Sequence, residues 1–195
     1  MTNPEDETYI ERIKQDDPKA LEQLFQKYYY SLCHFAKSFV KSPGLSEEIV
    51  SDVFLNIWQN RKNLKISHNL KAYLFIAIKN QSINMISKNK FSFDELEIAE
   101  RQQNLSDITA ESSLTYLETK KEIEAIIEEL PPQRKVIFRL NRLEGFKYKE
   151  IADILHISVN TVQKQMVEAV KHISQYESQF FATSILYAIL LAHFS

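Results

Sequence analysis

Apolar side chains recur at helical spacing along most of this chain, and that pattern limits the fold more than any other feature. The first long run follows Asp17-Pro18, a pair that suits the cap and first turn of a helix. It consists of Leu21, Leu24, Phe25, Tyr28, Leu32, Phe35 and Phe39. A composition with only two glycines in 195 residues, and with abundant Leu, Ile, Lys and Glu, suits helices better than sheets. The sequence therefore predicts an all-α fold.

Three helices are predicted in the first half of the chain. Ser42-Pro43-Gly44 is expected to end the first helix. Ser46-Glu47-Glu48 is expected to open the second, because acids suit the N-terminal end of the helix dipole. The third is expected from about Asn69 to Ser87, and it is apolar on more than one face, so much of it should be buried. Three helices with short links make a small bundle.

A polar, acidic stretch at residues 91–113 separates this bundle from a second helical region, and we interpret it as a linker. The helical pattern returns at Leu114, and Pro131-Pro132 interrupts it. Short helices are then expected at about 132–143, 147–155 and 158–173. The predicted organisation is a helical domain at 5–90, a linker at 91–113, a second helical domain at 114–174 and an apolar C-terminal helix at 175–195.

Charge is distributed unevenly along the chain, although its net value is only −2. Residues 20–90 hold ten basic and four acidic residues, a balance of +6, and residues 131–173 hold eight and four, a balance of +4. Between them, residues 91–130 hold three basic and eleven acidic residues, a balance of −8. Two basic blocks that flank an acidic one indicate a polyanionic partner. Solvated helix faces would produce the same pattern, so charge alone leaves both interpretations open.

The segment from Lys147 to Lys171 has the pattern of a helix-turn-helix. Ile151, Ala152 and Leu155 share one face of the first helix, and His156-Ile157 makes the turn. A turn of this kind often contains glycine, so His156 is expected to adopt a left-handed conformation at modest cost. Ser158 suits the N-cap of the second helix. The side chains expected to face inward from that helix are Val162, Met166, Ala169 and Val170.

The outer side of the second helix is polar near its N-terminal end. Amides there can hydrogen-bond to base edges in the major groove, while a lysine and the helix N-terminus bind phosphate. The candidate DNA-binding residues are Ser158, Asn160, Thr161, Gln163, Lys164 and Gln165. Two ordinary packed helices with a polar outside are the alternative, but the spacing and the cap favour DNA binding.

Four segments of the chain, which occur in the same order as in the family, resemble the extracytoplasmic-function subgroup of the sigma-70 factors of bacterial RNA polymerase. LPPQRKVIFRLNRLEGFKYKEIADILHISVNTVQKQMVEAVKHI is similar to the fourth region of that family, which binds the promoter −35 element. DDPKALEQLFQKYYYSLCHFAKSF resembles the start of the second region. SEEIVSDVFLNIWQNRKNL is similar to the part that docks on the clamp of the largest polymerase subunit. NLKAYLFIAIKNQSINMISKN is similar to the part that melts and reads the −10 element.

The resemblance implies an all-α sigma factor, with a three- or four-helix region-2 bundle and a region-4 helix-turn-helix joined by the acidic linker. Polymerase contacts would fall on Glu47, Glu48, Asp52, Phe54 and Asn56. Contacts with the −10 element would fall on Lys71, Tyr73, Lys79, Asn80 and Asn84. The family often has Asp at the position of Asn84, and Arg near Ser87. Taken singly, Phe54, Trp58 and Tyr73 could also be core aromatics, and Glu47 and Glu48 could serve only the helix dipole.

The implied partners are core RNA polymerase, through the clamp and the β flap, promoter DNA and an anti-sigma factor. No small-molecule substrate and no cofactor are expected. The histidines lie far apart without ligand spacing, so no metal site is predicted, and no catalytic constellation indicates an enzyme. The single cysteine, Cys33, and an acidic N-terminus without a signal-peptide core suggest a cytoplasmic protein.

Residues 180–194 form a fifteen-residue apolar run, shorter than the roughly 17–25 residues of a spanning helix. We interpret the run as a packed terminal helix. It could instead dock an inhibitory partner or mask the DNA-binding surface. Two other identities for the whole chain are a two-component or quorum-type regulator with a similar helix-turn-helix, and a helical adaptor that does not bind DNA. The first would need a receiver or ligand-binding domain with strands, and residues 1–110 show no such pattern.

Overall fold

The computed structural model describes residues 4–64, 66, 69–90 and 123–175, and in this part of the chain every regular element is a helix. The all-α prediction is therefore confirmed. The described residues fall into two compact units. The first comprises those within 1–92 together with 149–157, and the second those within 93–148 and 158–195. The predicted linker at 91–113 and the apolar run at 180–194 lie outside the described residues. The predicted domain bounds thus stay a prediction.

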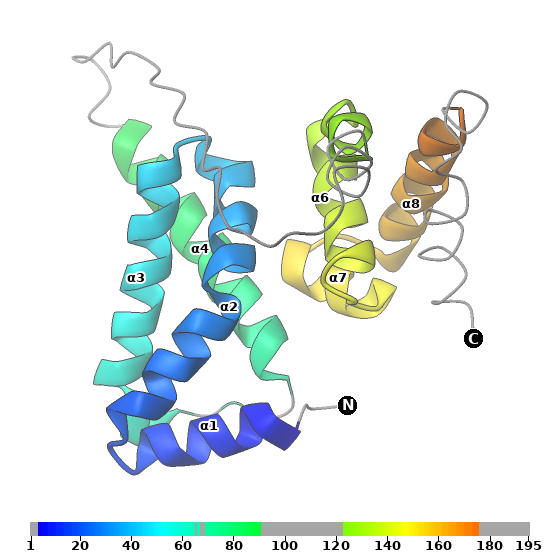
Figure 1. Ribbon diagram of the computed structural model, residues 1–195. Coiled ribbons are helices and arrows are strands. Elements are labelled where there is room, and N and C mark those ends of the chain that lie inside the picture. Colours follow the sequence, from blue (N-terminus) through cyan, green and yellow to red (C-terminus); the bar gives the residue numbers. More distant parts are fainter. Residues whose placement is uncertain (1–3, 65, 67–68, 91–122, 176–195) are drawn as a thin grey trace, which may run out of the picture. The chain divides into compact units, whose positions relative to one another are not determined.

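The first unit is a helical bundle. Helices α2 (Pro18–Val40), α3 (Pro43–Gln59) and α4 (Leu70–Lys90) run alongside one another, and α1 (Pro4–Lys14) crosses one end of them (Figure 1). A 3-10 turn, η1 (Arg61–Asn63), follows α3. The core is aromatic and aliphatic: the rings of Phe35 and Phe75 lie 4.9 Å apart, and those of Phe25 and Phe54 lie 5.0 Å apart, edge to face. Phe35, Phe54 and Phe75 are buried, and burying a side chain of this kind contributes about 1.5–3 kcal/mol of stability.

Helix α1 was not predicted, and it is held by both apolar and polar contacts. Ile10 and Ile13 are buried. Asp6 is also buried, and its carboxylate accepts hydrogen bonds from the Tyr28 hydroxyl at 2.7 Å and from the Lys27 ammonium at 2.8 Å. A buried carboxylate needs such partners to offset its desolvation. The acids of the first turn and the bases of the last turn of α1 also suit the helix dipole.

Two sequence expectations for the first bundle are corrected by the helix boundaries and faces. Helix α3 does not open at Ser46-Glu47-Glu48: its N-cap is Ser42, which accepts a hydrogen bond from the Leu45 N–H, and Pro43 occupies the first turn. Proline suits that position because its fixed φ is helical and the missing N–H would be unpaired there anyway. In α4, Leu70, Leu74, Phe75 and Ile78 are buried as expected, but Tyr73 and Ile83 are 37% and 43% exposed, so its apolar side chains do not all belong to the core.

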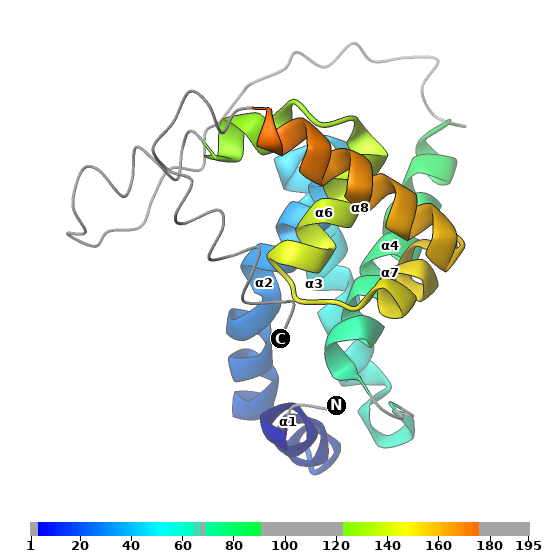
Figure 2. The same ribbon diagram turned by 90° about the vertical axis from the view of Figure 1, so that its right-hand side faces the viewer.

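The second unit contains helical residues 123–128, α6 (Pro132–Arg142) and α8 (Val159–Ser174). Helix α7 (Tyr148–Leu155) lies between α6 and α8 in sequence. These bounds agree with the predicted short helices to within a residue or two. Helix α6 packs beside α8, and Figure 2 shows the full length of α8. After α6 the chain turns through Gly145 at φ 72, where glycine carries no steric penalty, and the Phe146 N–H donates to the Leu140 carbonyl.

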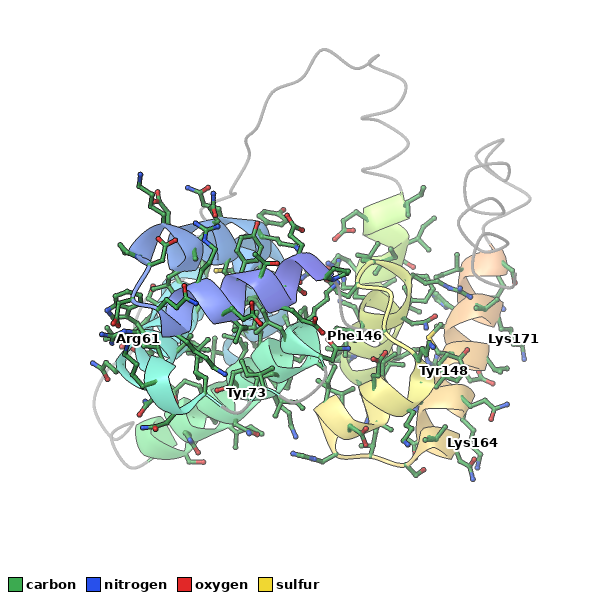
Figure 3. The ribbon with its side chains drawn as sticks, turned by 90° about the horizontal axis from the view of Figure 1, so that it is seen from below. Arg61, Tyr73, Phe146, Tyr148, Lys164 and Lys171 are labelled. Carbon is green, nitrogen blue, oxygen red and sulfur yellow. The ribbon has the colours of Figure 1, made fainter. Side chains whose placement is uncertain are left out.

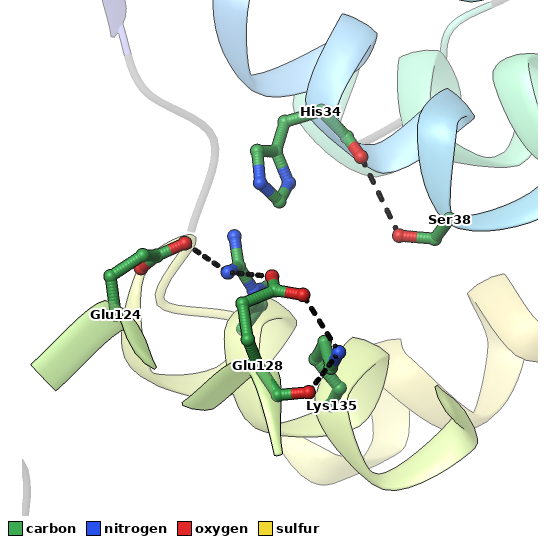
Figure 4. Close-up of polar contacts among 6 residues, drawn as sticks. His34, Ser38, Glu124, Glu128 and Lys135 are labelled. Carbon is green, nitrogen blue, oxygen red and sulfur yellow. Dashed lines mark hydrogen bonds and ion pairs between the residues drawn. The ribbon is translucent and has the colours of Figure 1, made fainter. Parts of the chain in front are cut away.

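An ionic cluster joins the 123–128 helix to α6. The buried Arg139 guanidinium pairs with both Glu124 and Glu128, and Lys135 pairs with Glu128 at 2.9 Å (Figure 4). Among the described helices, none is both long enough and apolar enough to cross a membrane.

Candidate nucleic-acid and polymerase interfaces

The turn between α7 and α8 has the backbone conformation that the sequence predicts. His156 adopts φ 55, in the left-handed region, and the Ile157 N–H donates to the Ala152 carbonyl at 3.0 Å. Ser158 caps α8, because its hydroxyl oxygen accepts a hydrogen bond from the Thr161 N–H at 3.0 Å. The cap satisfies one orphan donor of the first turn and fixes where α8 begins. Both expectations are confirmed.

Helix α8 buries one face and exposes the opposite one. Val162, Met166 and Ala169 are buried as predicted, whereas Val170 is only half-buried and Ile173 takes an inner position that was not predicted. The exposed side includes Asn160, Gln163, Lys164, Val167 and Lys171. We call these five residues the α8 outer face. Figure 3 shows Lys164 and Lys171 pointing away from the helix. An uncharged amide tip followed by lysines suits base-edge and phosphate contacts.

Two of the predicted DNA-binding residues of α8 are already engaged within the protein. Thr161 is half-buried, and its hydroxyl lies 2.8 Å from that of Ser158. Gln165 is also half-buried, and its carbonyl oxygen accepts a hydrogen bond from the Arg134 Nε of α6 at 3.2 Å. Arg134 is not among the residues predicted from the sequence. Val167 is not among them either, although its spacing from Asn160 and Gln163 places it on the same helix face.

The predicted −10 residues of α4 are divided by burial. Tyr73, Asn80 and Asn84 are exposed and share one face, since they are seven and four residues apart. We call them the α4 strip. Lys71 is half-buried. Lys79 is only 7% exposed, and burial lowers the pKa of its ammonium because the charged form is desolvated. Its stem therefore belongs to the core more than to the strip.

The predicted polymerase contacts of α3 are likewise divided. Glu48, Asp52 and Asn56 are exposed at four-residue spacing, while Glu47 is half-buried. Phe54 is only 3% exposed and packs edge to face on Phe25, so its ring is a core aromatic, as the alternative interpretation had it. The next residue, Leu55, is 54% exposed beside the acids. We call Glu48, Asp52, Leu55 and Asn56 the α3 strip.

Comparison with protein families finds two models that match this chain. Sigma-70 region 2 matches residues 24–92, which contain the α3 and α4 strips. Sigma-70, region 4 matches residues 120–173, which contain the α8 outer face.

Similar proteins span almost the whole chain. RNA polymerase sigma-H factor of Pseudomonas aeruginosa is 21% identical over 177 residues, covering 87% of this chain and 92% of that protein. ECF RNA polymerase sigma-E factor of Escherichia coli K12 is 24% identical over 172 residues, covering 84% and 90%.

Two solved structures have a similar fold. One is CnrH in complex with the cytosolic domain of CnrY, with a TM-score of 0.56 and 17% identity, covering 89% of this chain and 97% of that chain. The other is the sigma factor RpoE in complex with the anti-sigma factor NepR from Bartonella quintana, with a TM-score of 0.54 and 17% identity, covering 83% and 98%.

Proposed function

Since this chain belongs to the sigma-70 family, in its extracytoplasmic-function subfamily, we propose that it binds core polymerase through α3 and promoter DNA through α4 and α8. Sigma factors of this family are transcription initiation factors, and the polymerase supplies the chemistry. Within the described ranges, no group of His, Cys, Asp and Glu could hold a metal ion. The protein acts in the cytoplasm, where polymerase and chromosome are found.

The α8 outer face carries the proposal for the −35 element. Asn160 and Gln163 present carboxamides that can pair with base edges, and Lys164 presents an ammonium to the phosphates. Val167 is 60% exposed, and an apolar side chain at this place suits the methyl group of a thymine. The Ser158 cap keeps the first turn helical, so these groups are held in order before DNA binds.

The α4 strip supports binding of the −10 element as unpaired bases. Tyr73 offers a partly exposed ring on which a base can stack, and Asn80 and Asn84 offer hydrogen bonds to base edges. Binding single strands in preference to duplex drives melting without a catalytic group. Lys79 is buried, and Lys71 is the predicted cation that remains partly accessible to the DNA backbone.

The α3 strip is proposed to dock on the clamp of the largest polymerase subunit. Leu55 is a large exposed apolar side chain, and Glu48, Asp52 and Asn56 place polar groups along one side of it. An apolar centre with a polar rim is the usual anatomy of a protein interface. Leu55 therefore replaces Phe54 as the proposed apolar contact. The second unit is proposed to contact the β flap.

An anti-sigma factor is proposed to control the protein. One of the two similar structures is a sigma factor, RpoE, solved in complex with the anti-sigma factor NepR, and the other is CnrH solved in complex with the cytosolic domain of CnrY. A regulator of this kind would cover the surfaces that bind polymerase or DNA.

Run-off transcription on fragmented genomic DNA, with purified core polymerase and the full chain, tests the proposed function. Transcripts should start at a limited set of sites that share two spaced elements. Substituting Gln163 and Lys164 by alanine should remove dependence on the upstream element. The matched control is Gln26→Ala, which removes an exposed amide from α2. If the wild-type protein adds no site-specific transcripts to those of core polymerase, the proposal is wrong.

A further inference from the structure

Arg134 and Gln165 link α6 to the DNA-facing helix. Arg134 lies in the first turn of α6, and its Nε donates a hydrogen bond to the Gln165 carbonyl oxygen at 3.2 Å. Both side chains are half-buried, and the two helices are packed against each other through buried apolar residues of α6 and α8. This contact restrains the side chain of Gln165, one of the −35 residues predicted from the sequence, which lies between the α8 outer face and the buried face of the helix.

The chemistry of the pair also fixes which way round the carboxamide lies. A guanidinium has N–H donors and no acceptor, so the atom of Gln165 that faces it must be the oxygen. The carboxamide nitrogen takes no part in this contact, and it can only donate. Bidentate pairing with adenine would need both amide atoms, so the oxygen would have to accept from adenine and from Arg134 at the same time.

We propose that Arg134 is a positioning residue that holds Gln165 as a hydrogen-bond donor to an acceptor of the −35 element. The acceptors in the major groove are N7 of a purine, O6 of guanine and O4 of thymine. A restrained donor loses less conformational freedom on binding than the exposed amides of Asn160 and Gln163. The inference rests on the proposed function, because it requires that α8 reads the −35 element.

The test measures binding of holoenzyme, formed from core polymerase and the full chain, to promoters with each −35 base pair substituted in turn. Arg134→Ala should lower discrimination at one base pair by about three- to tenfold, the value of one hydrogen bond. Gln165→Ala should act at the same base pair, and the double variant should lose no more. Arg134→Lys, which retains a donor, should restore part of the discrimination.

Two further variants separate positioning from charge and folding. Lys135→Ala removes a cation from the adjacent position of α6, where the ammonium binds Glu128, and should leave discrimination unchanged. Gln165→Glu keeps the oxygen that Arg134 uses but removes the proposed donor. It should therefore lose discrimination at the same base pair while the free protein unfolds at an unchanged temperature.

The inference is overturned if Arg134→Ala weakens binding to every −35 sequence equally, which would indicate a direct phosphate contact. It is also overturned if Arg134→Ala and Gln165→Glu leave discrimination intact. A wild-type holoenzyme that shows no −35 preference would overturn the proposed function, and the inference with it. The wild-type measurement therefore distinguishes the two failures.

Discussion

The ionic cluster around Arg139 predicts an unequal response to removing its two kinds of partner. Arg139 is only 8% exposed, whereas the side chains of Glu124 and Glu128 are 46% and 56% exposed. The cation is therefore the desolvated member, and the acids keep much of their water. Removing the acids should cost more stability than removing the cation.

The magnitudes follow from that difference in burial. Glu124→Gln with Glu128→Gln removes both carboxylates that pair with the buried guanidinium, and breaking a buried pair in this way costs about 3–5 kcal/mol. The amide oxygens can still accept hydrogen bonds, so we expect about 2–3 kcal/mol here. Arg139→Met keeps an unbranched apolar stem, and it leaves two carboxylates that remain largely solvated, of which Glu128 still pairs with Lys135. Exposed pairs are worth about 0–1 kcal/mol, and this is the expected cost.

Native-state amide hydrogen exchange on the full chain measures both effects where they occur. The free energy of opening should fall in α6 and α8 by the amounts given, while α2, in the other unit, should be unaffected and serves as the internal reference. The reasoning is refuted if Arg139→Met destabilises α6 and α8 as much as the double glutamine variant does.

Four more predictions follow from single contacts. His156→Gly should stabilise the turn before α8 by about 0.5–1 kcal/mol, measured by hydrogen exchange, because φ 55 disfavours a side chain. Ser158→Ala should cost about 1 kcal/mol in the first turn of α8 by the same method, and should weaken −35 binding. Phe54→Ala should lower the free energy of unfolding by about 3–5 kcal/mol, whereas Leu55→Ala should leave it unchanged and weaken core-polymerase binding in a titration. Burial raises the pKa of Tyr29 to about 12, so the folded state favours the neutral phenol. The stabilising contribution of this phenol should be complete below pH 10.0 and lost as the pH rises toward about 12. In denaturation curves over this pH range, Tyr29→Phe should lose less stability than the wild type.

Features set by neighbouring residues were predictable from the sequence. The Asp17 and Ser158 caps and the left-handed His156 all depend on residues within one turn of each other. The start of α3 was also local, since Pro43 after Ser42 is a helix N-terminus signal, but Ser46 followed by two acids gave a competing one. Helix α1 was missed because its eleven residues are mostly polar, and its stability depends on Tyr28 and Lys27 of α2.

The parts of the site that escaped prediction depend on distant residues. The exposed positions of Asn160, Gln163 and Lys164 follow from helical periodicity alone. The contact between Arg134 and Gln165 joins residues 31 apart in sequence, and no local pattern specifies which side chains meet where two helices pack. Periodicity predicts the face of a helix, and packing decides which polar groups on its edge remain available.

In α3, the family motif locates the segment proposed to bind polymerase, but it does not identify which apolar side chain makes the contact. A family motif assigns Phe54 to the docking segment, but five apolar side chains at 49, 50, 53, 54 and 57 already form the buried stripe of this helix. Each residue turns the helix by about 100°, so Leu55 falls outside that stripe and must face water or a partner. An apolar residue outside the buried stripe, next to acids at four-residue spacing, indicates an interface more strongly than an apolar residue within the stripe does. Periodicity alone therefore favoured Leu55 over Phe54, and burial of the Phe54 ring against Phe25 agrees with it.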